Sequence, residues 1–144
     1  MKEGICGFEN DEARFLSNFW PCRVVYEGTT YTSSEHAYQA AKTRNLAEKQ
    51  YIADLSTPGQ AKRAGKGITL REDWYDIRLQ VMEDILRIKF MTNEDLKQKL
   101  ISTEFLYLEE TNTWGDVFWG VCNKRGQNHL GRILMRIRDE LWRT

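Results

Sequence analysis

The sequence is poor in the residues that build metal sites and disulfide frameworks. Its 144 residues include two histidines and three cysteines, and Cys6, Cys22 and Cys122 show no C-x-x-C spacing. Zinc sites need closely spaced Cys and His ligands, and a disulfide framework needs paired cysteines. We therefore expect no metal site and no cofactor, and reduced thiols of the kind found in the cytoplasm.

An excess of one charge and a long apolar run are also missing. The 21 Lys and Arg residues balance the 21 Asp and Glu residues, so no overall field draws the chain to nucleic acid or to an anionic membrane. The N-terminus opens no long apolar run, and no later stretch approaches the roughly 20 apolar residues that cross a bilayer. We expect a cytoplasmic protein with no membrane partner, no strong general nucleic-acid binding, and phosphate contacts that are local. The sequence leaves the oligomeric state open.

Aromatic residues, in contrast, are plentiful. They make up 12% of the chain and include five tryptophans. Large flat side chains supply core volume and also surfaces on which a base can stack, and composition does not separate these two uses. The chain has no repeat and no linker-like run, and both prolines lie at apparent element boundaries. Residues 1–144 are therefore predicted to form a single domain.

Hydrophobic periodicity predicts an α+β fold that is predominantly α-helical: a multihelical domain with a small N-terminal β-hairpin or ribbon. Extended pieces are expected at residues 5–8, 22–26, 29–32 and 105–108, with Glu27-Gly28 as a hairpin turn. Helices are expected at residues 34–42, 46–55, 58–65, 73–90, from 93 onward, and 130–141. Residues 109–127 are expected to be a loop. The helix at 73–90 should be a central buried element, with one apolar stripe formed by Trp74, Ile77, Val81, Ile85 and Ile88.

The helix that begins near Ser34 carries the first candidate site. Glu35, Gln39 and Lys42 stand at positions i, i+4 and i+7, so a carboxylate, an amide and an amine share one narrow face. Such a face is a plausible catalytic wall. The alternative is that Glu35 closes an S/T-x-x-E capping box that starts at Thr32, and that Lys42 is a solvated charge.

The loop at residues 111–120 is the second candidate. It combines Trp114, Phe118 and Trp119 with the carboxylate of Asp116. Loops rarely expose several large aromatics without a purpose, although these side chains could equally fold back onto the core as a lid.

Two weaker candidates complete the set. Residues 62–67 form a basic, glycine-containing helix end that could cradle a phosphate through charge and backbone N–H groups, or could simply be a solvated helix C-terminus. Asn18, in the irregular stretch 15–21, could read a base edge or a ribose hydroxyl, or could satisfy loop backbone groups.

Taken together, these motifs resemble the NADAR family of YbiA-like proteins. The matching pieces are FLSNF (15–19), TSSEHAYQAAK (32–42), AKRAGKG (61–67) followed by Trp74, DVFWG (116–120) and NHLGRILMRIRDEL (128–141). They run in family order over nearly the whole chain. The resemblance implies an N-glycosidase that hydrolyses the bond between a phosphorylated ribose, either ribose 5-phosphate or ADP-ribose, and a nitrogen base. Its small-molecule substrate would be a ribosylamino-pyrimidine intermediate of riboflavin synthesis or ADP-ribosylated guanine, with ADP-ribosylation reversal as the function in the second case.

The resemblance also implies residue roles. The catalytic set would be Glu35, Lys42, Asp116 and Trp119, and the substrate-binding set would be Asn18, Phe19, Arg63, Trp74 and Asn128. The chain holds two Trp-Gly pairs, and we align the family motif on Trp119-Gly120. Some members follow this pair with Asp, where this chain has Val121, so Asp116 or Glu35 would have to do the work of that carboxylate.

Two chemistries are compatible with this set. In one, Glu35 handles a proton or activates water, and Asp116 stabilises the cationic sugar. In the other, an uncharged Lys42 amine forms a Schiff base with the ring-opened sugar. Both require Glu35 and Lys42 to line the same cavity as the tryptophan loop. The rival hypotheses are a non-catalytic module that only binds ADP-ribose or a related nucleotide, and a purely structural domain.

Overall fold

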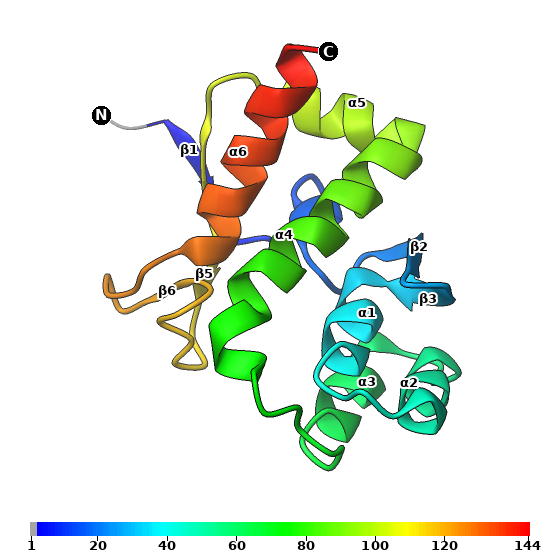
Figure 1. Ribbon diagram of the computed structural model, residues 1–144. Helices are drawn as coiled ribbons and strands as arrows, with labels where there is room; N and C mark the ends of the chain where they lie inside the picture. The colour runs from blue at the N-terminus through cyan, green and yellow to red at the C-terminus, as the bar shows by residue number, and fades with distance from the viewer. Residues whose placement is uncertain (1–2) are drawn as a thin grey trace. The chain divides into compact units, whose positions relative to one another are not determined.

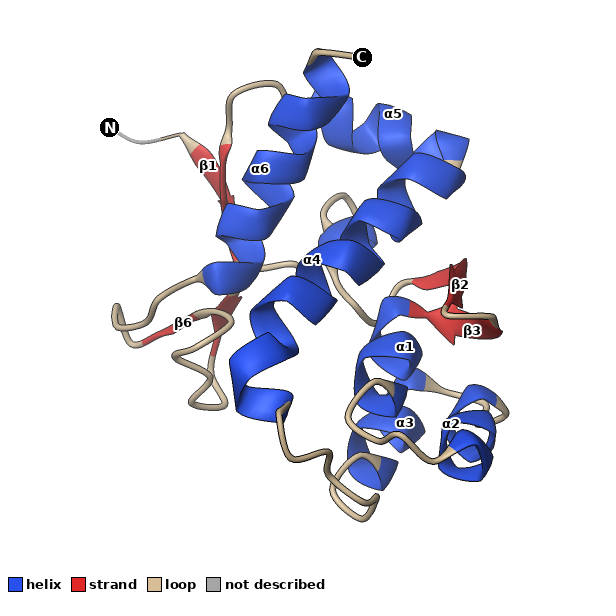
Figure 2. Cartoon of the chain, viewed as in Figure 1, coloured by secondary structure: helices blue, strands red, loops and turns tan. Residues whose placement is uncertain are grey.

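A computed structural model describes residues 3–144, and these residues are mainly helical (Figures 1 and 2). They form six α-helices and six short strands, which confirms the predicted α+β class with its predominance of helix. The chain divides into two compact units. The central unit is Asn18–Asn93, and the terminal unit is residues 3–17 together with Glu94–Thr144. The assignment of residues 1–144 to a single domain stays a prediction.

The central unit begins with the predicted hairpin. Strand β2 (Pro21–Tyr26) pairs antiparallel with β3 (Thr29–Ser33). The two turn residues, Glu27 and Gly28, have φ angles of 49° and 84°. A two-residue type I′ turn places both residues in this left-handed region, and its twist matches that of the flanking strands.

Helix α1 (Ser34–Ala40) is the core of the central unit. All seven of its residues are buried, and it contacts the hairpin and the three other helices of the unit (Figure 1). These are α2 (Leu46–Ala53), α3 (Pro58–Ala64) and α4 (Trp74–Thr92). Ala37 and Ala40 are fully buried, and their small side chains let neighbouring elements approach closely. A helix buried on every side holds its polar side chains away from bulk water.

Local signals in the sequence explain where α2 and α3 begin. The Asn45 side chain caps α2 by accepting from the Glu48 N–H. Thr57 and Gln60 form a reciprocal capping box at the start of α3, with Pro58 at the first turn. Proline is tolerated there because its missing N–H would have had no partner within the helix.

Helix α4 differs in part from the predicted stripe. Trp74, Val81 and Ile85 are buried as expected. Ile77 and Ile88 are half-buried, and the remaining buried positions are Met82, Leu86, Lys89 and Phe90. Two adjacent columns of side chains are covered, so the buried face is wider than a single stripe and includes a lysine.

In the terminal unit, the N-terminal strand pairs with a distant partner. Strand β1 (Gly4–Cys6) runs parallel to β4 (Tyr107–Glu109). The sequence had suggested that β1 would join the hairpin in one ribbon, and this expectation was wrong. The segment predicted to be a loop over 109–127 contains two short parallel strands, β5 (Thr111–Asn112) and β6 (Val121–Cys122). A single 3₁₀ turn, η1 (Arg14–Leu16), precedes the central unit.

Helix α6 (His129–Trp142) packs against β4 and against α5 (Glu94–Ser102) (Figure 2). Its predicted apolar face is buried and consists of Leu130, Ile133, Leu134, Ile137 and Leu141. Arg138 is also buried, and it donates to Thr103 Oγ1 at 2.9 Å and to the Leu106 carbonyl at 2.8 Å. None of the helices within residues 3–144 has both the length and the apolar character needed to cross a membrane.

Candidate functional site

Glu35 does not close a capping box. The N-cap of α1 is Ser33, whose hydroxyl accepts from the His36 N–H at 3.1 Å. Glu35 lies one position too early for the reciprocal bond, and its own N–H donates to the Asn18 carbonyl at 3.1 Å. The capping-box interpretation of the motif at residues 32–35 is therefore wrong, and the Glu35 carboxylate does not cap the helix.

The Glu35 carboxylate is held inside the central unit. The residue is 8% exposed, and Gln39 Nε2 donates to Glu35 Oε2 at 2.6 Å. The bond joins positions i and i+4 of α1, as the helical spacing predicts. A buried carboxylate that receives a hydrogen bond is fixed in one orientation, which is a requirement for acid–base catalysis.

Lys42 follows α1 by two residues and is half-buried. Burial lowers its pKa, and the nearby cations Lys62 and Lys66 lower it further, while the Glu35 carboxylate acts in the opposite direction. Its Nζ lies 5.7 Å from the centre of the Tyr38 ring. A lowered pKa raises the fraction of uncharged amine, the form in which lysine acts as a nucleophile.

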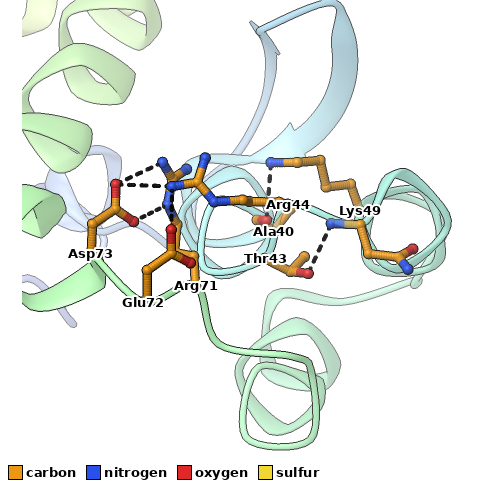
Figure 3. Close-up of polar contacts among 8 residues, drawn as sticks. Ala40, Thr43, Arg44, Lys49, Arg71, Glu72 and Asp73 are labelled. Atoms are coloured by element: carbon orange, nitrogen blue, oxygen red, sulfur yellow. Dashed lines mark hydrogen bonds and ion pairs between the residues drawn. The ribbon is translucent and has the colours of Figure 1, made fainter.

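The residues that follow α1 are joined by ion pairs to the segment before α4 (Figure 3). The Arg71 N–H donates to the Lys42 carbonyl at 2.7 Å. Arg71 Nε lies 2.6 Å from Asp73 Oδ1, and Arg44 Nη2 lies 3.2 Å from Asp73 Oδ2. The same Arg44 nitrogen lies 3.0 Å from Glu72 Oε1. The segment before α4 is thereby tied to the residues that follow α1, including the backbone of Lys42.

Asn18 and Trp74 are buried, and both make contacts within the central unit. Asn18 Oδ1 accepts from Ser34 Oγ at 2.7 Å, and its Nδ2 lies 3.6 Å from Met82 Sδ. The Trp74 ring is tilted against the Tyr38 ring at a centroid distance of 5.1 Å. These contacts position the start of α1 and the start of α4. The roles of both residues as substrate contacts stay predictions.

Phe19 and Arg63 are more accessible. Phe19 is 42% exposed. Arg63, on α3, is exposed and lines a hollow of about 460 Å³ between α2, α3 and the segment that follows α3. Tyr51 and Glu48 line the same hollow. Its volume is in the range of small-molecule pockets, and it offers a guanidinium and an aromatic ring to a ligand.

In the terminal unit, Asp116 shapes the tryptophan loop. Its Oδ1 accepts from the backbone N–H groups of Phe118 at 3.1 Å and Trp119 at 2.9 Å. Asn112, which is 5% exposed, stabilises the same turn through two hydrogen bonds. Its Oδ1 accepts from the Asp116 N–H, and its Nδ2 donates to the Asp116 carbonyl. Asn112 was not among the residues predicted from the sequence. Its signal is an amide four residues before an aspartate that opens a turn.

The two Trp-Gly pairs differ in what their glycines require. A Cβ on Gly120 would lie 2.0 Å from the Glu110 carbonyl oxygen, whereas a Cβ on Gly115 would meet nothing within 4 Å. Trp119 is half-buried and stacks edge-on against Phe118 at 4.8 Å, while Trp114 is 51% exposed. These differences favour Trp119-Gly120 as the pair with a fixed structure.

Asn128 connects the start of α6 to the strands. It is 3% exposed, and its φ of 53° lies in the left-handed region that asparagine tolerates. Its Oδ1 accepts from the Glu110 N–H at 3.0 Å, and its Nδ2 donates to the Leu108 carbonyl at 3.0 Å. The amide therefore has a structural role, and its contact with substrate stays a prediction.

The predicted site residues are distributed over both units. The central unit supplies Asn18, Phe19, Glu35, Lys42, Arg63 and Trp74, and the terminal unit supplies Asp116, Trp119 and Asn128. The structure places Lys42, two residues after α1, where it interacts electrostatically with Glu35, and it brings Asp116 and Trp119 together in one turn. That all four line one cavity stays a prediction. Within residues 3–144 there is no group of three or more His, Cys, Asp or Glu side chains that could hold a metal ion.

Comparison with known proteins places these motifs in a family. A model of the NADAR domain matches residues 7–142. A riboflavin biosynthesis protein of Vibrio vulnificus is 40% identical over 145 residues, which cover 98% of this chain and 39% of that protein. The chain thus spans about two fifths of the length of this relative. The N-glycosidase YbiA of Shigella boydii is 35% identical over 148 residues, covering 98% of this chain and 91% of that protein.

Among solved structures, the NMR structure of the E. coli protein YbiA matches with a TM-score of 0.84 and 31% sequence identity. The match covers 99% of this chain and 87% of that one. The family model, the relatives and the structure agree over nearly the whole sequence. The chain therefore belongs to the NADAR family.

Proposed function

We propose that this protein is an N-glycosidase that hydrolyses the bond between a phosphorylated ribose and a nitrogen base. The observation that carries the proposal is the buried Glu35 carboxylate on α1, oriented by Gln39, beside a lysine whose pKa is lowered. A buried acid–base group and a nearby amine with a lowered pKa are more than a binding module needs. The name N-glycosidase, borne by a relative with 35% identity, supports the same chemistry.

Breaking a ribosyl C–N bond requires a proton on the leaving nitrogen and stabilisation of positive charge on the sugar carbon and ring oxygen. In the hydrolytic route, Glu35 activates a water molecule or transfers the proton. Asp116 stabilises the cationic sugar, and Trp119 and Trp74 flank the base or the ribose. A positioned acid–base group accounts for roughly 10²–10⁴ in rate.

A lysine route is the second possibility for the same bond. The uncharged Lys42 amine adds to the anomeric carbon of the ring-opened sugar, and the base leaves as an amine that takes up a proton. The resulting lysine imine is then hydrolysed by water, which releases the sugar phosphate and restores the amine. The lowered pKa of Lys42 supports this route.

We propose two substrate classes: ribosylamino-pyrimidine phosphates of riboflavin synthesis, and ADP-ribose linked to guanine. The first is supported by the name of the Vibrio relative. The cations near the end of α3, Lys62, Arg63 and Lys66, are a local source of phosphate affinity in a chain without net charge. The three cysteines are free, which suits a reducing compartment such as the cytoplasm.

A panel of both substrate classes, assayed for released ribose phosphate and ADP-ribose, tests the proposal. We expect turnover by the wild type, and a loss of roughly 10²-fold or more in kcat for Glu35→Gln, with an unchanged melting temperature. The exposed residue Glu12 provides the matched control, because Glu12→Gln should retain full activity. Near-wild-type turnover by Glu35→Gln would contradict the catalytic role. Tight binding of ADP-ribose without product would favour the binding module.

Borohydride trapping during turnover separates the two routes. The lysine route predicts a reduced sugar adduct on Lys42, found by mass spectrometry of the digested protein, and no adduct in Lys42→Arg, which keeps the charge but cannot form an imine. Absence of the adduct in the active wild type would eliminate the covalent route and leave direct hydrolysis.

A further inference from the structure

The Gln39 side chain lies between the proposed catalytic carboxylate and the end of α3. Its Nε2 donates to Glu35 Oε2 at 2.6 Å, and the residue is 5% exposed. Its Oε1 is buried and has no hydrogen-bond partner within residues 3–144. A buried carbonyl without a partner is costly, so a specific constraint must keep the amide in this orientation.

The orientation follows from the charge on Glu35. If the amide turned over, Gln39 Oε1 would face Glu35 Oε2, and two acceptors would meet without a hydrogen between them. The observed arrangement is therefore the stable one while Glu35 is ionised. The present orientation lets Gln39 donate to an ionised Glu35, whose oxygens can only accept.

Gly65 provides the space for this arrangement. It is the C-cap of α3 and has a φ of −58°, an ordinary helical value that any residue can adopt. A Cβ built at this position would lie 1.8 Å from Gln39 Oε1 and 2.7 Å from Gln39 Cδ. The glycine is thus required by the side chain of Gln39 and not by the backbone.

We propose that Gln39 is a positioning residue that holds Glu35 as an oriented anion. The missing side chain at Gly65 leaves the space that the Gln39 amide occupies. The inference rests on the proposed function and refines it. An ionised Glu35 acts as the base that takes a proton from water, and the proton for the leaving nitrogen comes from another group.

The charged groups on this side of the central unit favour the same state. Lys42, at the end of α1, interacts electrostatically with Glu35, and Lys62 and Lys66 act on Lys42 from α3 and the segment after it. In its charged form, Lys42 therefore favours a carboxylate over a carboxylic acid at Glu35.

Two substitutions remove the contact from opposite sides. Gln39→Met keeps the size of the side chain and removes the donor, and Gly65→Ala displaces the amide without touching Glu35. We expect each to lower kcat by roughly 10- to 100-fold, with little change in KM, because the carboxylate loses its orientation. Gly59→Ala on the same helix is the matched control, since its Cβ would lie 3.9 Å from the nearest atom, Thr57 Oγ1, and it should leave kcat unchanged.

The pH dependence of kcat in Gln39→Glu is a readout that a loss of packing alone would not change. At low pH the introduced carboxyl is protonated and donates to Glu35, so part of the activity should return. As the pH rises, the second proton is lost, two carboxylates oppose each other, and kcat should fall over a range in which the wild type does not lose activity.

Glu35→Gln, assayed beside these variants, separates the two levels of the proposal. An active Glu35→Gln would overturn the proposed function. An inactive Glu35→Gln combined with near-wild-type kcat in folded Gln39→Met and Gly65→Ala would overturn only the role of Gln39. If either variant does not fold, Gln39→Glu decides: a pH profile parallel to that of the wild type would contradict the inference.

Discussion

At the residue scale, Lys89 is a buried charge that the proposed chemistry does not use. It lies on α4 with no exposed surface, and burial lowers its pKa to about 8, while Cys22 acts in the opposite direction. Its Nζ is 5.1 Å from the centre of the Phe90 ring. A lysine in this setting is retained at a cost in stability at neutral pH, because its charged form is less well solvated than in the unfolded chain.

The pH dependence of stability tests this effect. Between the folded pKa of about 8 and the ordinary value of 10.5, the unfolded chain binds more protons than the folded one, so the free energy of unfolding should rise with pH. Lys89→Met should show a smaller rise, because only the lowered pKa values of Lys42 and Lys49 still contribute to it. It should also be more stable than the wild type at pH 7 by on the order of 1–3 kcal/mol.

Urea denaturation of both proteins between about pH 7 and pH 9.5 is the measurement. Tyr26 sets the upper limit of the range, because its pKa is raised to about 12 and its titration in the unfolded chain, near 10, lowers stability. Parallel curves for the two proteins would mean that the environment of Lys89 does not disfavour its charge.

Predictability at this scale depended on whether the partners were close in sequence. Glu35 and Gln39 are four residues apart, so helical spacing alone predicted that they share a face. The space left by Gly65 for Gln39, and the burial of Lys89, depend on packing between separate elements. A local pattern does not contain that information.

At the element scale, α6 packs closely against β4 at Gly131. A Cβ on Gly131 would lie 2.1 Å from the Leu108 carbonyl oxygen and 2.5 Å from Asn128 Nδ2. These two neighbours share one hydrogen bond, from Asn128 Nδ2 to the Leu108 carbonyl, so neither can move away without breaking this connection between helix and strand.

Gly131→Ala should therefore destabilise the protein by roughly 1–3 kcal/mol through overpacking. Gly59→Ala on α3 is the comparison, because its Cβ would make only an ordinary contact with Thr57 Oγ1 at 3.9 Å and its better helix propensity should add up to about 1 kcal/mol. Urea midpoints of the two variants should move in opposite directions. A Gly131→Ala variant as stable as the wild type would show that α6 can shift without cost.

The elements themselves were predicted unequally well. The hairpin, α2, α3 and α6 were expected within a few residues of their observed ends, because turns, caps and apolar periodicity are local signals. The pairing of β1 with β4 joins residues near opposite ends of the chain, and the strands β5 and β6 have two residues each. Neither feature leaves a periodic pattern long enough to detect.

At the scale of the whole molecule, charge is balanced between 21 cations and 21 anions, so substrate recognition must come from local groups. The family motifs that carry those groups are spread over both units, and motif order in the sequence was sufficient to recognise them. What motif order does not provide is the energetic coupling between the residues, which has to be measured.

A double-mutant cycle measures that coupling between Glu35 and Asp116. Glu35→Gln removes the charge on α1. Asp116→Asn removes the charge in the tryptophan loop but keeps an oxygen that can accept from the Phe118 and Trp119 N–H groups, so the turn should persist. If both carboxylates serve one chemical step, their effects on kcat/KM should be strongly non-additive, and the double variant should be little worse than the poorer single variant. Effects that multiply would mean that Asp116 contributes independently of Glu35, and full activity in Asp116→Asn would remove its charge from the mechanism.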